Sequence, residues 1–364
     1  MPIVNVTEAM NYAVELAAQG PAYGPNPRVG AVLLRGGDVI GVGWHRGAGS
    51  AHAEAAALQD AQANGNDATG ATLVVTLEPC RHHGRTPPCT DLIINAGIAD
   101  VVYACADPGD RSGGGATELR RAGIEVSKLE NAAATELIHA WATSIRLGRP
   151  YVTVKLATSL DGRVAAADGT SQWITGSASR AHAHQVRAQV DAIVVTTGTV
   201  LADNPALTAR MPDGTLAAHQ PLRVVVGQRE IPADARLYES AAAHSATASA
   251  SASTESSRHA AAAAPVLCLP THDITEVLAA LAERQVRQVL IEGGPALVTA
   301  CFAADAVDEV HAYLAPVVLG AGPSAVSDYG ATTLGAAERF TTNEVRKLGD
   351  DVLLIARKAQ VSGN

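Results

Sequence analysis

The sequence of 364 residues has few cysteines, little charge and no long apolar run, and each shortage excludes a class of protein. Its five cysteines are odd in number and sparse for the length, which argues against the disulfide framework of a secreted protein. No stretch approaches the roughly 18 uninterrupted apolar residues of a membrane span. No Lys or Arg precedes Arg28, so no secretory signal is visible. We therefore expect a soluble protein of the reducing cytoplasm.

Positive charge is also in short supply. Lys and Arg number 27 against 36 Asp and Glu, which gives a net charge of −9. Such a surface repels polyanions, so nucleic acid is an unfavourable partner and a bound phosphate needs a local site. Apolar residues nevertheless make up 47% of the chain and charged residues only 17%, which excludes a disordered protein. The length predicts about two domains.

The first part of the chain alternates helical and strand patterns. Expected helices lie at 7–19, 51–63, 86–96, 118–122 and 132–147, and expected strands at 29–34, 39–44, 72–77, 101–106 and 125–129. After the last of these helices, Gly148 favours a stop and Pro150 biases Arg149 towards an extended conformation. The sequence therefore predicts two domains, at 1–147 and 151–364.

The second part continues the alternation, which is typical of an α/β domain with a largely parallel sheet. Expected strands lie at 151–157, 192–196, 223–226, 265–269, 289–292 and 309–314, and expected helices at 177–189, 274–284 and 295–304. Residues 240–264 are of low complexity, since 12 of these 25 residues are Ala, 7 are Ser and 2 are Thr. With so little bulky apolar surface, this segment is expected to be a disordered surface insertion.

Four residues of the first domain form a set with metal chemistry. His52 and Glu54 lie in a predicted helix. Cys80 follows a predicted strand, and Cys89 falls in the first turn of another predicted helix. One imidazole and two thiolates suit a catalytic zinc, because three protein ligands leave a fourth position for water. Glu54, two residues from a ligand, is then placed as a proton shuttle, and the set predicts hydrolytic deamination of an amidine-like carbon.

A zinc-stabilised binding module is the alternative that is not an enzyme. Such a module needs a fourth protein ligand close to Cys80 and Cys89, which His82 or His83 can supply. The loop that carries these histidines and Arg85 is basic in an acidic protein. A phosphate on the substrate would explain His82 and Arg85, and an ordinary solvated loop is the other explanation.

The other cysteines are expected to be structural. They lie within apolar runs and should be buried as small hydrophobic residues: Cys105, Cys268 and Cys301.

A second kind of site is indicated where the expected strand at 289–292 runs into Gly293 and Gly294. Two glycines let the backbone approach a ligand, and the helix that starts at Pro295 offers free amides to a pyrophosphate. A Rossmann fingerprint would need G-x-G-x-x-G after the first strand, and none occurs there. A bound dinucleotide therefore implies another fold, and without one the glycines form an ordinary turn.

Longer motifs of the first domain resemble the deaminase half of the bifunctional riboflavin-biosynthesis deaminase/reductase family. The resemblance is carried by PNPRVG at 25–30, GWH at 43–45, HAE at 52–54 and EPCRHHGRTPPC at 78–89. The long spacing between the two cysteines separates it from cytidine and tRNA-adenosine deaminases. The resemblance implies a cytidine-deaminase-like αβα domain with zinc ligands at His52, Cys80 and Cys89 and Glu54 as the proton donor. It also implies contacts with the substrate at four further residues: Asn26, His45, His82 and Arg85.

Motifs of the second domain resemble the reductase half of the same family, which has a dihydrofolate-reductase-like α/β fold. They are KLATSLDG at 155–162, SQWIT at 171–175, TVLADNP at 199–205, LTAR at 207–210 and EGG at 292–294. The resemblance implies residues that face NADPH: Ala157, Trp173, Thr199, Asp203 and Gly294. It implies residues that face the substrate: Ser171, Arg187, Leu207, Arg210 and Glu292. Arg187 and Arg210 suit a ribose 5-phosphate, because a guanidinium makes paired hydrogen bonds to it.

Together the two halves predict a two-step enzyme. The first domain would remove the 2-amino group of a phosphorylated diaminopyrimidinone ribosylamine with Zn²⁺, and the second would reduce the ribosyl group to ribityl with NADPH. The alternative enzyme is a deaminase of another nucleobase with an unrelated second half. The sequence leaves open a homo-oligomer, the reductase proton donor, passage of the intermediate between sites and the group that recognises the 2′-phosphate of NADPH, for which Arg229 is one candidate.

Overall fold

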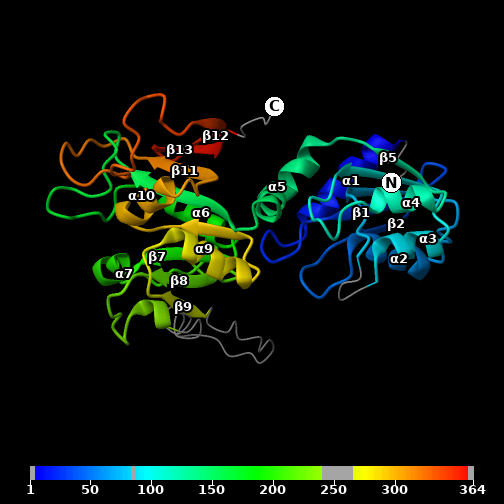
Figure 1. The fold of residues 1–364 in the computed structure, drawn as a ribbon, viewed down its shortest axis with the longest axis horizontal. Helices are drawn as coiled ribbons and strands as arrows, with labels where there is room; N and C mark the ends of the chain where they lie inside the picture. Colours follow the sequence, from blue (N-terminus) through cyan, green and yellow to red (C-terminus); the bar gives the residue numbers. More distant parts are fainter. Residues whose placement is uncertain (1–4, 83–86, 240–264, 360–364) are drawn as a thin grey trace. The chain divides into compact units, whose positions relative to one another are not determined.

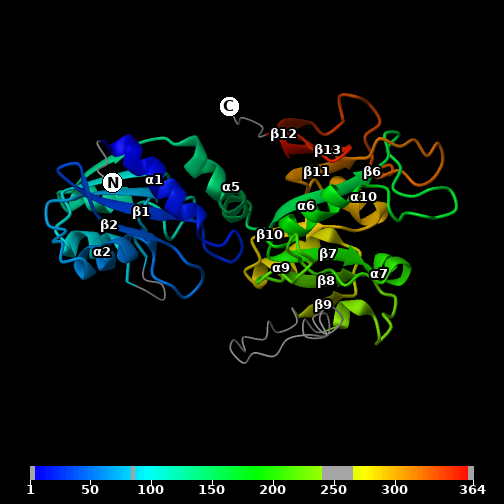
Figure 2. The same ribbon diagram turned by 180° about the vertical axis from the view of Figure 1, so that it is seen from behind.

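The computed structural model describes residues 5–82, 87–239 and 265–359. The chain divides into two compact units, Met1–Gly148 and Arg149–Asn364, and each has its own sheet and its own core. Both are visible in Figure 1 and, from behind, in Figure 2. The low-complexity segment 240–264 lies outside the described residues.

The first unit is built on a five-stranded sheet of order β2-β1-β3-β4-β5. Its strands are β1 (Gly30–Arg35), β2 (Asp38–Trp44), β3 (Thr72–Leu77), β4 (Asp100–Cys105) and β5 (Glu125–Lys128). β1 runs antiparallel to β2 and β3, whereas β3, β4 and β5 are parallel. The carboxyl ends of β3 and β4 therefore lie at the same edge of the sheet, where the predicted Cys80 follows β3.

Helices cover both faces of this sheet. They are α1 (Val6–Ala18) and α5 (Ala132–Leu147) on one face, and α2 (Ala53–Ala63), α3 (Cys89–Asn95) and α4 (Gly115–Arg121) on the other. Close approach of α2 depends on Gly43 in β2, because a Cβ there would lie 2.4 Å from the Ala53 oxygen and from the Ala57 nitrogen. The resulting αβα sandwich presses the first turn of α2, which carries Glu54, against the sheet.

The second unit is built on an eight-stranded sheet of order β12-β13-β11-β6-β10-β7-β8-β9. Its strands are β6 (Tyr151–Thr158), β7 (Ala192–Thr196), β8 (Leu222–Val226), β9 (Val266–Leu269), β10 (Gln288–Ile291), β11 (Glu309–Leu314), β12 (Phe340–Leu348) and β13 (Asp351–Lys358). The strands from β11 to β9 are parallel, and β12 and β13 extend the sheet as an antiparallel hairpin. The largely parallel sheet is as the sequence predicts.

Helices also cover both faces of the second sheet. They are α6 (Ser177–Arg187) and α7 (Thr197–Asp203) on one face, and α9 (Ile274–Glu283) and α10 (Pro295–Ala303) on the other, with a 3₁₀ turn, η1, at Arg236–Tyr238. Because side chains alternate along a strand, Val152 and Val154 of β6 enter the core under α9 and α10. Thr153 and Lys155 then point to the α6 face, where polar groups gather.

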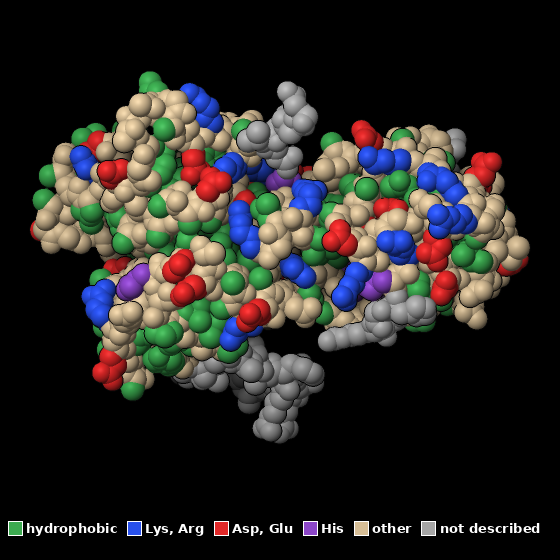
Figure 3. All heavy atoms as spheres, viewed as in Figure 1, with side chains coloured by type: hydrophobic (Ala, Val, Ile, Leu, Met, Phe, Trp, Pro, Cys, Tyr) green, Lys and Arg blue, Asp and Glu red, His purple; other side chains and the backbone are tan. Residues whose placement is uncertain are grey.

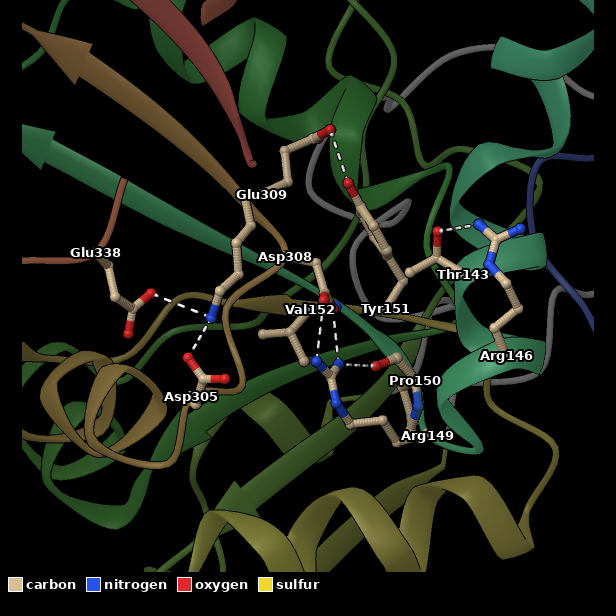
Figure 4. A network of polar contacts seen from close by, with 11 residues as sticks. Thr143, Arg146, Arg149, Pro150, Tyr151, Val152, Asp305, Asp308, Glu309 and Glu338 are labelled. Atoms are coloured by element: carbon tan, nitrogen blue, oxygen red, sulfur yellow. Dashed lines mark hydrogen bonds and ion pairs between the residues drawn. The ribbon is translucent and has the colours of Figure 1, made fainter. Parts of the chain in front are cut away.

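The second unit begins with an ion pair (Figure 4). Nη1 and Nη2 of Arg149 lie 2.7 and 2.9 Å from the two carboxylate oxygens of Asp308. The backbone N–H of Val152 donates to the same carboxylate at 2.7 Å. Arg149 is thus held by the second unit, whereas the sequence placed the start of that domain at 151.

Three local expectations are corrected. α3 begins at Cys89, later than predicted, because Pro88 disfavours the helical conformation at Pro87 and itself forms an extended N-cap. Cys268 is exposed, because it lies on β9, the edge strand of the sheet, whereas Cys105 and Cys301 are buried. The sequence also missed α7 and the β12–β13 hairpin, whose outer strand is mostly exposed and lacks an apolar alternation.

Charges of both signs share the surface. On the face drawn in Figure 3, acidic side chains interrupt the basic ones in both units. In the ranges that the structure describes, no helix combines the length and the apolar character needed to cross a bilayer.

Candidate functional site

Three elements of the first unit bring the predicted metal ligands together. His52 is the N-cap of α2, Cys80 follows β3 and Cys89 is the first residue of α3. Their ligand atoms all lie within 4.8 Å of one another. Nδ1 of His52 is 3.3 Å from Sγ of Cys89 and 3.6 Å from Sγ of Cys80. The three predicted metal ligands therefore converge, and the predicted Glu54 lies beside Cys89.

The donor set fits zinc. A hydrogen bond from the Cys89 thiol lowers the pKa of Cys80 to about 4 and raises that of Cys89, so the two sulfurs share one proton. The hydrogen bond with Cys80 also raises the pKa of His52. Two sulfurs and an imidazole that compete for protons at such short range are the donors of a borderline-soft divalent cation. Among the described residues, this is the only such group, and it contains no fourth ligand.

Glu54 lies in the first turn of α2 and is only 4% exposed. Burial, followed by the charge on Cys80, raises the pKa of its carboxyl group to about 6. A carboxyl group with that pKa exchanges a proton near neutrality, as a general acid and base must. The predicted proton shuttle therefore has the environment that its role needs.

The turn that carries Cys80 is held by a carboxylate that sequence reasoning did not assign. Glu78 accepts hydrogen bonds from the backbone N–H of Ala116 at 2.9 Å and of Asp107 at 3.2 Å. The carbonyl of Cys80 accepts from the N–H of Thr90 at 3.2 Å. The position of Glu78, two residues before a metal ligand, was visible in the sequence. Its hydrogen-bond partners, however, are 29 and 38 residues away along the chain.

His45 and Asn26 also lie at this site, bound to each other. Nδ1 of His45 lies 3.1 Å from the carbonyl of Ala51, and Nε2 lies 2.9 Å from the side-chain amide of Asn26. Burial lowers the pKa of His45, so its ring is neutral, donates to Ala51 and accepts from Asn26. Its ring centroid is 5.8 Å from that of His52. His45 thus fixes the backbone next to a metal ligand as well as the amide of Asn26.

The basic loop is only partly described. His82 has a buried Nδ1 with no hydrogen-bond partner among the described residues, and it is not part of the metal-ligand group. Arg85 and His83, the expected phosphate contact and the alternative fourth ligand, lie outside the described residues.

In the second unit, Glu292 follows β10 and is the centre of a buried ion cluster. Nε and Nη2 of Arg187 lie 2.6 and 2.8 Å from its two oxygens, and Nζ of Lys155 lies at 3.2 Å. Burial would raise the pKa of Glu292, but Arg187 and Lys155 outweigh it and hold that pKa far below its usual range. The guanidinium of Arg187 is paired with Glu292 in this structure, and its expected contact with the substrate phosphate stays a prediction. Sequence reasoning missed Lys155, whose signal was a cation inside an apolar strand.

The other expected substrate residues lie around this cluster in different ways. Nη1 of Arg187 and Nδ1 of His184 both lie 3.0 Å from the carbonyl of Thr208. Burial, followed by the charge of Arg187 and more weakly that of Arg210, lowers the pKa of His184 to about 4. Leu207 is buried in the core under α6 and α7, so only its backbone is available to a ligand. Ser171 is half-buried in the loop before α6.

The residues expected to face NADPH follow one edge of the sheet. Ala157 lies at the carboxyl end of β6, Thr199 in the first turn of α7, and Gly294 at the N-cap of α10. A Cβ on Gly294 would meet only Oγ1 of Thr199, at 4.0 Å, which leaves open space before the helix amides. Such a turn fits a pyrophosphate.

The other two expected cofactor residues are more exposed. Asp203 is the exposed last residue of α7. Trp173 is 69% exposed, and the guanidinium of Arg180 lies 4.5 Å from its ring centroid. A ring that is this exposed is available to stack on a flat ligand.

Comparison with known protein families matches both units. Residues 4–105 match the model described as cytidine and deoxycytidylate deaminase zinc-binding region, and residues 150–354 match the RibD C-terminal domain. The chain is 44% identical over 357 residues to the riboflavin biosynthesis protein RibD of Mycobacterium tuberculosis, covering 97% of each. It is 38% identical to RibD of Escherichia coli, covering 95% of this chain and 97% of that protein.

Solved structures agree over the full length. RibD of Acinetobacter baumannii superposes with a TM-score of 0.81 at 34% identity, covering 98% of this chain and 99% of that one. The deaminase/reductase of Thermotoga maritima superposes with a TM-score of 0.80, also at 34% identity, covering 97% and 99%. With two domain models matched in the same order, the chain belongs to the RibD family of riboflavin biosynthesis proteins, which join a zinc-binding deaminase domain to a reductase domain.

Proposed function

We propose that this protein catalyses two consecutive steps of riboflavin biosynthesis. The first unit hydrolyses the 2-amino group of 2,5-diamino-6-(5-phosphoribosylamino)pyrimidin-4(3H)-one, and the second reduces the ribosyl side chain to ribityl with NADPH. One observation carries the first step: a histidine and two cysteines lie within 4.8 Å of one another beside the buried Glu54. The relative from Thermotoga maritima is named for these two activities.

In the deaminase half, His52, Cys80 and Cys89 would hold zinc, which supplies the Lewis acidity that makes water a nucleophile at neutral pH. Glu54 would take a proton from water and deliver one to the departing amine, because a pKa of about 6 allows both transfers. Asn26 would orient the substrate, since His45 fixes its amide at 2.9 Å. His82 and Arg85 would be the candidates for the phosphate.

In the reductase half, NADPH supplies the hydride when it is bound. The open turn at Gly294 and the hydroxyl of Thr199 would hold its pyrophosphate. Ala157, Trp173 and Asp203 would line the rest of its site. Lys155 and the Arg187–Glu292 pair would present fixed charges to the ribosyl chain, because none of the three can move without breaking a buried ion pair.

The setting we propose is the cytoplasm. All five cysteines are free thiols, which suits a reducing compartment. The partners we propose are small phosphorylated pyrimidines, with neither nucleic acid nor membrane. Light scattering of the purified chain tests whether it self-associates.

The direct test is an assay of both steps with the purified chain. The pyrimidine substrate should release ammonia in a zinc-dependent step, and NADPH oxidation should follow only after that release. NADPH oxidation without ammonia release, or ammonia release from cytidine in preference to this substrate, would contradict the proposal.

A further inference from the structure

We propose that Arg229 recognises the 2′-phosphate of NADPH and thereby makes the reductase half prefer NADPH to NADH. The inference rests on the proposed function, because it takes NADPH as the hydride donor. Arg229 lies three residues beyond the end of β8. It belongs to the edge where the parallel strands of the second sheet end, which is where open α/β sheets bind their ligands.

The strand order places Arg229 at the adenosine end of the cofactor. Along this edge, β6 carries Ala157, β10 leads to Gly294, β7 leads to Thr199 and β8 leads to Arg229, in the order β6-β10-β7-β8. In NADPH the pyrophosphate separates the nicotinamide from the adenosine. With the nicotinamide at β6 and the pyrophosphate between Gly294 and Thr199, the adenosine ribose falls one strand further. That step is about 4.8 Å and leads to β8.

Local packing turns the loop after β8 towards Thr199. Gly227 has a φ of +122°, and a Cβ there would lie 2.6 Å from Oγ1 of Thr197. Gly198 also lacks a side chain, and Nη2 of Arg229 lies 2.5 Å from the position that its Cβ would take. The guanidinium of Arg229 therefore lies against the residue next to Thr199.

The charge of Arg229 is available to a ligand. Arg229 is exposed, and within the part of the chain that the structure describes it forms no ion pair, in contrast to Arg187 and Arg149. The loop after β9 adds His272, whose Cε1 would lie 3.3 Å from a Cβ on Gly227. A planar guanidinium forms paired, charge-assisted hydrogen bonds with phosphate oxygens. An uncommitted arginine at this place is therefore suited to a 2′-phosphate.

The test is ligand binding, measured by calorimetry on the full chain. Arg229→Ala should weaken NADP⁺ by roughly 10- to 100-fold, as expected for the loss of hydrogen bonds to a charged group. It should leave the affinity for NAD⁺ within about twofold, because NAD⁺ lacks the phosphate. Adenosine 2′,5′-bisphosphate and AMP, which carry only the adenosine end, should show the same contrast. Arg229→Lys should fall between the wild type and the alanine variant.

Arg284→Ala is the matched control. Arg284 is an exposed arginine at the C-terminal end of α9, whereas His272 lies before the start of that helix, so the substitution should leave every affinity unchanged. The ratio of the two affinities within one variant does not depend on the folded fraction, so partial misfolding cannot mimic the result. An unchanged ratio in Arg229→Ala, or an equal loss for NADP⁺ and NAD⁺, would overturn the role of Arg229 alone. A wild-type chain that binds neither dinucleotide would overturn the proposed reductase function as well.

Discussion

At the scale of single residues, Glu54 illustrates how burial changes what a carboxyl group can do. The spacing of two residues from His52 predicted its role, whereas the pKa of about 6 comes from burial and from the charge on Cys80. We predict that Glu54→Gln keeps about one zinc per chain, because Glu54 is not a ligand, and lowers deamination by roughly 100-fold or more. Metal analysis and ammonia release measure the two effects.

Glu15→Gln, a change at an exposed acid of α1, is the control for Glu54→Gln and should alter neither zinc content nor turnover. Loss of zinc from a folded Glu54→Gln protein would show that the carboxylate is a ligand. Turnover close to that of the wild type would remove Glu54 from proton transfer.

The roles of site residues that lie close to the end of a helix or strand could be predicted from the sequence. The roles of residues that depend on a partner far away in the sequence could not. His52 and Cys89 lie where helices begin and Cys80 lies shortly after a strand, so local patterns placed them. Arg187 and Glu292 are 105 residues apart, and no local sequence pattern indicates that they form an ion pair with each other. A guanidinium that suits a phosphate by its chemistry suits a buried carboxylate equally well.

At the scale of elements, the turn from β10 to α10 can be tested by one substitution. Gly294 has a φ of −68°, which any residue adopts, and a Cβ there would meet nothing closer than 4.0 Å. We therefore expect Gly294→Val to fold normally and to raise the KM for NADPH by about tenfold or more, because the added side chain occupies the space before the helix amides. Steady-state reduction kinetics and a thermal melt measure these effects.

Ammonia release is the internal control for Gly294→Val, since the zinc site belongs to the other unit and should not respond. A folded variant with unchanged NADPH dependence would remove this turn from the cofactor site. The backbone strain that a side chain on a glycine can cause does not arise at this φ, so a change in KM reports on the ligand.

Strands that are buried on both faces were well placed by their sequences, because a short apolar run bounded by turns is a strong signal. β3 and β7, which are buried along most of their length, have the predicted bounds. β11 also has the predicted bounds, although its burial alternates along the strand. The outer hairpin strand β12 is mostly exposed, so its sequence lacks the alternation on which prediction depends. The seven-residue α7 is shorter than the helical window needed for a periodic pattern.

At the scale of the whole molecule, the position of the boundary between the units affects stability. Arg149 is bound to Asp308 through two hydrogen bonds, and both residues belong to the second unit. We predict that fragment 149–364 folds and is more stable than fragment 151–364 by about 1–3 kcal/mol, because loss of Arg149 leaves a buried carboxylate without its cation. Urea unfolding of the two fragments measures the difference.

Asp308→Asn offers a check on this explanation. In fragment 151–364 the substitution should cost less than in fragment 149–364, because the unpaired charge is already there. Equal stability of the two unsubstituted fragments would show that Arg149 contributes only to the connection between the units. Fragment 1–148 should fold on its own, because its core cluster draws only on residues before Gly148.

A buried group of charges around Glu309 in the second unit makes the stability of that unit depend on pH in the acid range. Burial raises the pKa of Glu309, but hydrogen bonds from His311 at 2.6 Å and Arg357 at 2.7 Å outweigh it and lower the pKa from 4.5 to about 2. A carboxylate with a depressed pKa stabilises the fold above pH 4.5, and this contribution is lost as the pH falls through about 2. It amounts to something on the order of 3 kcal/mol.

The difference in unfolding free energy between wild type and Glu309→Gln should therefore shrink steadily between pH 5 and pH 2, and a difference that stays constant would contradict this account. The charges of Glu309, His311 and Arg357 are separate from the groups proposed to act in reduction, and they stand where aliphatic packing would resist acid. Selection for acid tolerance in this family would thus have to act on the scaffold of the reductase, at β11 and β13, and not on its ligand-binding groups.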